Sequence, residues 1–127
     1  MMEAMAFDTL TTHLADDDEV TIVTSRTDGS RVPTVIWAVV ADGVPYVRSV
    51  NAEHGHWYRR ASSSGTGAFQ IDGTDVGVAF SQVEDDTVIA AVDAAYSAKY
   101  ARYGDDLAAM LTDDSRACTL AVHAAVL

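Results

Sequence analysis

Positively charged and aromatic residues gather in one short stretch of the chain, YVRSVNAEHGHWYRRA, residues 46–61. It holds three of the eight Lys and Arg residues, two of the four His residues and one of the two Trp residues. The whole chain has a formal net charge of −11. A cationic stretch in so acidic a chain predicts either a set of local ion pairs or a site for an anionic ligand.

Arg48 lies on a predicted strand, VPYVRSV (44–50), and shares a face with Val44, Tyr46 and Val50 because side chains alternate along a strand. Burying a guanidinium without a partner costs several kcal/mol. Arg48 therefore needs a counter-charge, and either an acidic side chain or an anionic ligand would serve.

A short helix is predicted over residues 56–64, and the start of a helix is suited to binding anions because its first N–H groups lack helical acceptors. Arg59 and Arg60 lie within one turn, and arginine binds phosphate in a bidentate manner. Ser49 adds a donor and Trp57 a flat apolar wall. This set favours a phosphate attached to a planar ring. The alternative is that both arginines pair with surface carboxylates while Trp57 belongs to the core.

Other chemistries find less support in the sequence. The pair His54 and His56 is too weak a pattern to indicate a metal site, so none is predicted. Residues 62–64 (SSS) lack a nucleophile-elbow setting, and residues 65–67 (GTG) lack the rest of a P-loop. Cys118 falls in a predicted apolar strand, where a small buried side chain is expected. No catalytic residue is nominated.

The composition is that of a globular domain: 127 residues, 49% hydrophobic and 21% charged. One domain over residues 1–127 is expected. No apolar run approaches the roughly 18 residues of a membrane span, and no secretory signal is visible, so a cytoplasmic protein is expected. The acidic balance argues against nucleic acid and membrane partners. A single cysteine excludes an intramolecular disulfide.

Hydrophobic periodicity and turn signals predict an α+β fold, a six-stranded antiparallel split β-barrel with flanking helices. An N-terminal helix at about 3–15 precedes a barrel at about 19–126. Asp-Gly pairs at 28–29, 42–43 and 72–73 mark tight hairpins. The expected strands are 19–26, 32–40, 44–50, 68–71, 74–83 and 116–126, and a long helix is expected at 86–102.

The strand VPTVIWAVV (32–40) is apolar on both faces, so it needs two covers. One is the barrel interior. The other is a helix or a second subunit, and this favours a homodimer. Tyr96, Tyr100 and Tyr103 have helical spacing, which indicates core packing.

Four segments resemble an uncharacterised bacterial family, a domain of unknown function: VPYVRS (44–49), GHWYRRA (55–61), AVDAAYSAKYARYG (91–104) and RACTLAV (116–122). The resemblance covers about residues 19–124. That family is similar to the split β-barrel superfamily, which includes pyridoxamine 5'-phosphate oxidase-like flavoproteins and deazaflavin-dependent nitroreductases.

The resemblance implies a homodimer that binds FMN or a deazaflavin at its interface and oxidises or reduces a small molecule. It implies that the third strand and the following loop and helix hold the cofactor. The matching positions here are Arg48, Ser49, Trp57, Tyr58 and Arg60. The alternative is a cofactor-less split-barrel module that binds a small ligand or regulates a partner.

Overall fold

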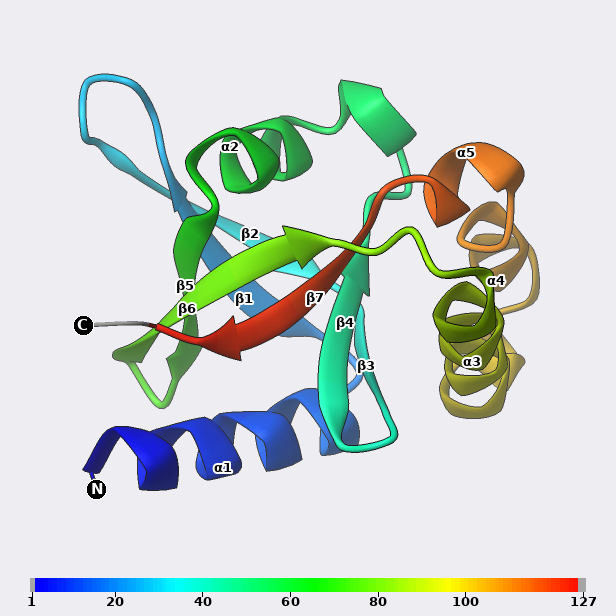
Figure 1. The fold of residues 1–127 in the computed structure, drawn as a ribbon, viewed down its shortest axis with the longest axis horizontal. Helices are drawn as coiled ribbons and strands as arrows, with labels where there is room; N and C mark the ends of the chain where they lie inside the picture. Colours follow the sequence, from blue (N-terminus) through cyan, green and yellow to red (C-terminus); the bar gives the residue numbers. More distant parts are fainter. Residues whose placement is uncertain (1, 126–127) are drawn as a thin grey trace.

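The fold is known from a computed structural model, which describes residues 2–125. Its helices are α1 (Met2–Asp16), α2 (His56–Ser64), α3 (Asp86–Lys99), α4 (Gly104–Ala109) and α5 (Asp113–Arg116), with short 3-10 turns η1 (Ala52–His54) and η2 (Ala101–Tyr103). Its strands are β1 (Val20–Ser25), β2 (Arg31–Ile36), β3 (Ala38–Ala41), β4 (Val44–Arg48), β5 (Thr66–Ile71), β6 (Thr74–Gln82) and β7 (Thr119–Ala124). The predicted α+β class is confirmed (Figure 1).

The strands form one antiparallel sheet in the order β2-β1-β5-β6-β7-β4-β3. The two edge strands, β2 and β3, are consecutive in the chain and are separated by Trp37 alone. The sheet must therefore curl until its two edges lie one residue apart. The result is a curled, half-open barrel (Figure 1).

The sheet has seven strands rather than the predicted six, because the segment predicted as one strand over 32–40 is divided at Trp37. Its first half pairs with β1, with Ile36 opposite Val20. Its second half pairs with β4, with Ala38 opposite Val47. A strand that changes partners must leave one ladder before it joins the next, and the break falls on Trp37.

Two of the predicted hairpins are confirmed in backbone detail. Asp42 and Gly43 have φ values of 51° and 80°, and Asp72 and Gly73 have values of 50° and 80°. Positive φ at both central residues is the signature of a type I′ turn, whose twist matches that of the flanking strands. The Asp-Gly sequences therefore set the registers of β3 with β4 and of β5 with β6.

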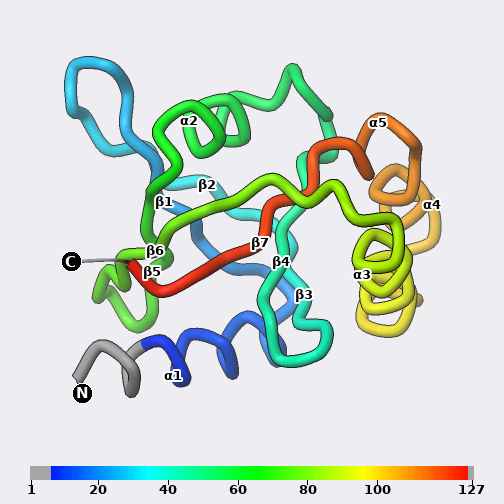
Figure 2. Tube along the Cα trace, viewed as in Figure 1, coloured from blue at the N-terminus to red at the C-terminus, as the bar shows by residue number. Residues whose placement is uncertain are grey.

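Apolar side chains pack on both faces of the sheet. Inside the barrel, Leu10 and Leu14 of α1 and Trp57 and Ala61 of α2 join the strand residues, so these two helices close the interior from opposite sides (Figures 1 and 2). Outside it, α3 packs on β3, β4 and β7, and the buried residues there are Val39, Tyr46, Val92, Tyr96, Tyr100, Met110 and Ala121. The expected core packing of Tyr96 and Tyr100 is confirmed.

The last quarter of the chain departs from the sequence prediction. The long helix begins at Asp86 as expected, with the Asp85 side chain accepting hydrogen bonds from the first turn, but it ends at Lys99. The 3-10 turn η2 follows it, and α4 opens at Gly104. The region between the predicted helix (86–102) and the predicted strand (116–126) contains α4 and most of α5, and the final strand begins only at Thr119. Residue 126 of that predicted strand lies outside the described residues. None of the described helices is long and apolar enough to cross a membrane.

Candidate functional site

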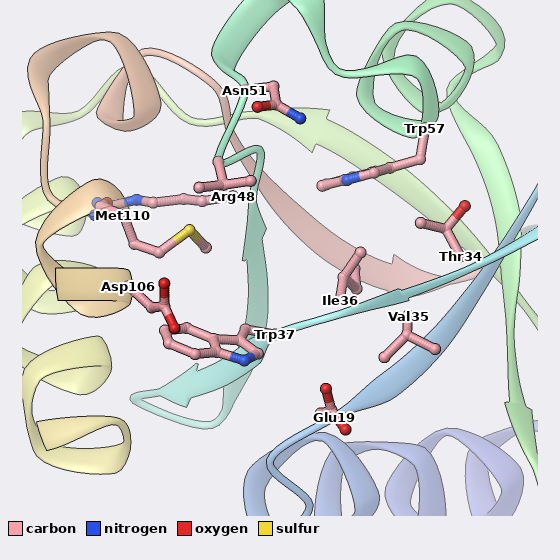
Figure 3. A pocket seen from close by; sticks show the side chains of 11 residues that line it. Glu19, Thr34, Val35, Ile36, Trp37, Arg48, Asn51, Trp57, Asp106 and Met110 are labelled. Atoms are coloured by element: carbon pink, nitrogen blue, oxygen red, sulfur yellow. Dashed lines mark hydrogen bonds between the residues drawn. The ribbon is translucent and has the colours of Figure 1, made fainter. Parts of the chain in front are cut away.

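A pocket of about 390 Å³ opens where β2, the loop after β4, the start of α2 and helix α4 meet (Figure 3). It combines aromatic, aliphatic and acidic side chains from segments far apart in the chain. Its lining residues are Glu19, Thr34, Val35, Ile36, Trp37, Arg48, Val50, Asn51, Trp57, Asp106 and Met110.

Two indole rings frame this pocket. Trp57 comes from the first turn of α2 and is only 8% exposed. Trp37 occupies the bend between β2 and β3, and its ring stacks on Tyr100 with centroids 4.0 Å apart and planes 4° apart. Tyr100 is fully buried, so it fixes the orientation of the Trp37 ring. The pocket therefore offers preset aromatic surfaces from two independent elements.

Arg48 is fully buried, and its guanidinium binds protein groups. Nε donates to Thr119 Oγ1 at 2.8 Å, and the terminal nitrogens donate to the main-chain oxygens of Met110 and Ile89, each at 3.1 Å. It also forms an ion pair with Asp93. In Figure 3 the guanidinium points away from the pocket, so only the stem of the side chain borders it. Of the two partners that the sequence left open, the acidic side chain is present.

Asp93 is shared between two arginines. Its second oxygen accepts from Nε of Arg116 at 2.8 Å, and Arg116 also pairs with Asp113. These hydrogen bonds raise the pKa of Arg116 further, so its charge persists. The network ties β4, α3 and α5 together on the outer side of the sheet and leaves Arg48 with little positive charge to offer a ligand.

Ser49 lies between two lining residues, Arg48 and Val50, and is buried at 1% exposure. Its hydroxyl has no hydrogen-bond partner among the described residues, which is unusual for a buried polar atom. A Cβ on Gly55, the residue that precedes α2, would lie 2.3 Å from Ser49 Oγ. Glycine is therefore required at 55, and the unpaired hydroxyl sits directly against the start of α2.

The other two predicted site residues point elsewhere. The Tyr58 hydroxyl donates to Gln82 Oε1 at 2.8 Å. The pKa of Tyr58 is raised to about 12, mainly by burial and to a smaller extent by the neighbouring Cys118 thiol. Arg60 Nε donates to Thr24 Oγ1 at 2.8 Å. Neither residue lines the pocket. The structure thus brings Trp57 and the Arg48 stem to the pocket, keeps Ser49 beside it, and separates Tyr58 and Arg60 from it.

Sequence reasoning missed the acidic part of the lining. Glu19 was assigned to the start of a strand, and Asp106 and Met110 fell between the predicted helix and the last predicted strand. No local pattern marks them, because Asp106 and Met110 reach the pocket only through the packing of α4 beside Trp37, and Glu19 reaches it from the residue before β1. Among the described residues no group of three or more His, Cys, Asp or Glu could hold a metal ion.

Several solved structures have a similar fold. Rv2991 from Mycobacterium tuberculosis, a conserved hypothetical protein, aligns with a TM-score of 0.59 and 18% identity over 99% of this chain and 81% of its own. HutZ, the heme storage protein from Vibrio cholerae, gives 0.62 and 10% over 95% and 85%. Campylobacter jejuni ChuZ gives 0.63 and 12% over 94% of this chain, which spans about half (52%) of ChuZ. At these identities the likeness concerns the fold.

Sequence comparison gives a family. No curated protein sequence matches the chain significantly. Residues 10–122 match the model of a family described as "Uncharacterized protein conserved in bacteria (DUF2255)". The match spans most of the chain, which agrees with the resemblance seen in its motifs, and the chain therefore belongs to the bacterial DUF2255 family.

Proposed function

We propose that this protein binds a small planar ligand in the pocket between Trp37 and Trp57. The observation that carries the proposal is the pair of indoles, one backed by Tyr100 and the other held by α2, beside four further apolar side chains of the lining. The volume of about 390 Å³ lies within the range of small-molecule sites, roughly 300–1,000 Å³. One protein of the same fold, HutZ, is named as a heme storage protein, and heme is also a planar ring system.

FMN or a deazaflavin is the more specific candidate. The ring system and the phosphate of such a cofactor would meet different parts of the site. The ring system suits the indole-lined pocket. The phosphate would be received by Ser49 Oγ, which lacks a partner, and by the first N–H groups of α2 beside it. Arg48 would contribute only its stem, because its guanidinium is bound to Asp93 and to three other acceptors.

A bound flavin or deazaflavin would supply hydride transfer, which makes an oxidoreductase of small molecules the corresponding activity. The chain's own part would be to orient the ring between the indoles and to exclude water with Ile36 and Met110. Tyr58 and Arg60 would act indirectly, because their bonds to Gln82 and Thr24 hold α2 against the sheet.

A cofactor-less module that binds a small ligand is the second candidate, and one observation favours it. Of the described residues that line the pocket, Arg48 alone is cationic, and its charge is neutralised by Asp93, whereas Glu19 and Asp106 are acidic. Such a lining suits a neutral or cationic ligand better than an anionic one.

We also propose that a second copy of the chain covers the mouth of the pocket. Val35 and Val50 line the pocket and are 60% and 52% exposed, the only large hydrophobic residues in the described part of the chain with such exposure. A homodimer would bury both, and it would enclose a ligand that one protomer leaves open on one side.

A fluorescence titration with FMN, riboflavin and the deazaflavin tests the redox candidate. FMN and riboflavin share the ring, so their difference reports the phosphate alone. We expect saturable micromolar binding of FMN, tighter than that of riboflavin. Replacing Trp57 by Leu should weaken both ligands. Binding of none of the three would reject the redox cofactors and leave the cofactor-less module.

The variant Ser49→Ala isolates the phosphate contact. Among the described residues the Ser49 hydroxyl has no hydrogen-bond partner, so its removal should not lower stability. We expect weaker FMN binding with unchanged riboflavin binding. An equal effect on both ligands would contradict the assignment of the phosphate to Ser49 and the start of α2.

A further inference from the structure

The charges that line the pocket are not balanced. We propose that the end formed by Glu19, Trp37 and Asp106 binds the positively charged amine of a planar ligand, so that the site selects cationic ring compounds. The proposal rests on the proposed function, because it concerns the same pocket and names the class of molecule that enters it. With a redox cofactor present, the amine belongs to the substrate; without one, it belongs to the ligand itself.

The two carboxylates are free to interact with a ligand. Within residues 7–125 the side chains of Glu19 and Asp106 form no hydrogen bond or ion pair, and both residues are exposed. Neighbouring carboxylates differ in this respect, since Asp18 pairs with Arg102 and Asp93 pairs with two arginines. An unpaired carboxylate at the wall of an aromatic pocket stabilises a cation that enters it.

Trp37 lies at the same end of the pocket as these carboxylates. In Figure 3, Asp106 stands beside the indole and Glu19 lies at that end, whereas Trp57 and Asn51 lie at the other end. Tyr100 covers one face of the Trp37 indole, so a cation would be attracted to the opposite face, and nearby carboxylates add to this attraction. A ligand with its ring toward Trp57 would therefore place an ammonium group near Trp37.

Among the described residues that line the pocket, Arg48 is the one cation, and it opposes this field only weakly. The guanidinium of Arg48 points toward α3 and is paired there with Asp93. The chain as a whole carries a net charge of −11, which repels anions from the mouth of the pocket. The preference for a cationic group is confined to the end of the pocket at Glu19, since the start of α2 at the opposite end favours negative groups.

Three naphthalene probes that differ only in charge test the proposal by isothermal titration calorimetry at low ionic strength. They are 2-naphthylmethylamine, 2-naphthylmethanol and 2-naphthylacetate. We expect the amine to bind about ten-fold more tightly than the alcohol, with the carboxylate weakest, because two carboxylates and an indole act on the charge. Added salt should narrow the difference.

The double variant Glu19→Gln, Asp106→Asn should bring the amine to the affinity of the alcohol. The matched control is Glu84→Gln, Asp105→Asn, which removes two exposed carboxylates that do not line the pocket. It should leave the preference for the amine intact.

An equal loss of the preference for the amine in both double variants would overturn the proposal, because it would assign the preference to the net charge of the whole protein. Equal binding of amine and alcohol to the unmodified protein would also overturn it and leave the pocket standing. Failure of all three probes to bind would reject the planar-ligand site itself.

Discussion

The two halves of the segment 31–41 have similar sequences and different surroundings. Val39 in β3 lies under α3 and is 1% exposed, whereas Val35 in β2 is on the same face and is 60% exposed. Trp37, between them, is half-buried and stacks on Tyr100. The helical layer ends at this bend, and the pocket begins there. An apolar sheet face that loses its cover within one strand is where a ligand or a second copy would bind.

Charged residues near the two halves of this segment differ in the same way, between the side covered by α3 and the open side at the pocket. On the covered side, Arg48 and Asp93 are paired and hydrogen-bonded, so their role is structural. On the open side, Glu19 and Asp106 have no such partners among the described residues. The residue types alone do not separate these roles, whereas burial and pairing do.

Replacing Arg48 should produce the largest effect on the covered side. The variant Arg48→Met keeps the apolar stem and removes the charge, which leaves Thr119 and two main-chain oxygens without their donor. Breaking a buried pair costs about 3–5 kcal/mol, and we expect a loss of that size in urea unfolding. Arg59→Met, at an exposed position, is the control and should stay within about 0.5 kcal/mol. Little loss of stability together with abolished FMN binding would instead make Arg48 a ligand contact.

Matched substitutions on the two halves test the difference in cover directly. Val39→Thr places a hydroxyl under α3 and should lower the free energy of unfolding by about 2 kcal/mol. Val35→Thr should cost less than about 0.5 kcal/mol at low protein concentration. If a second copy covers Val35, this cost should grow with protein concentration, because association stabilises the folded state.

Sedimentation of Val35→Asp gives the complementary readout, since a buried carboxylate would disfavour the dimer and shift the protein toward the monomer. Unchanged sedimentation as a monomer in both the variant and the parent would contradict the proposed homodimer.

The smallest expected effect is a pH dependence of stability that comes from Lys99, which lies near the bend between β2 and β3. Its Nζ donates to the main-chain oxygens of Leu14 and Ala38, each at 2.7 Å, and burial lowers the pKa of Lys99 to about 8. The unfolded chain keeps this proton up to about pH 10.5, so between pH 8 and 9.5 it binds more protons than the folded chain. The contribution of Lys99 to the free energy of unfolding therefore rises with pH in that window, by about 1 kcal/mol after allowance for solvent screening.

The measurement is the difference in unfolding free energy between the parent and Lys99→Met across that window. The comparison cancels other groups, including Cys118, whose pKa is raised by burial and whose contribution has the opposite sign. A difference that is independent of pH would show that Lys99 titrates normally in the folded protein.

Much of the fold could be predicted because it depends on neighbouring residues. The tight turns at Asp42-Gly43 and Asp72-Gly73 and the bounds of α2 follow from residues within one or two turns of each other. The α+β class and the two-faced strand were predicted for the same reason, and α3 proved to be one of the two covers expected for it.

The candidate site could be predicted only in part. The stretch 46–61 pointed to Trp57 and Ser49, which lie at or beside the pocket, and to Tyr58 and Arg60, which do not line it. The orientation of α2 against the sheet decides which of its faces meets the pocket, and that orientation depends on packing with β1.

Local patterns thus define the strands, the turns and the need of Arg48 for a counter-charge. They do not identify that counter-charge as Asp93, 45 residues away, nor bring Asp106 beside Trp37. These outcomes depend on how far α3 extends over the sheet and on where the barrel bends between β2 and β3. Both are properties of long-range packing, in which many weak contacts between distant segments select one arrangement, and no short window of sequence contains them.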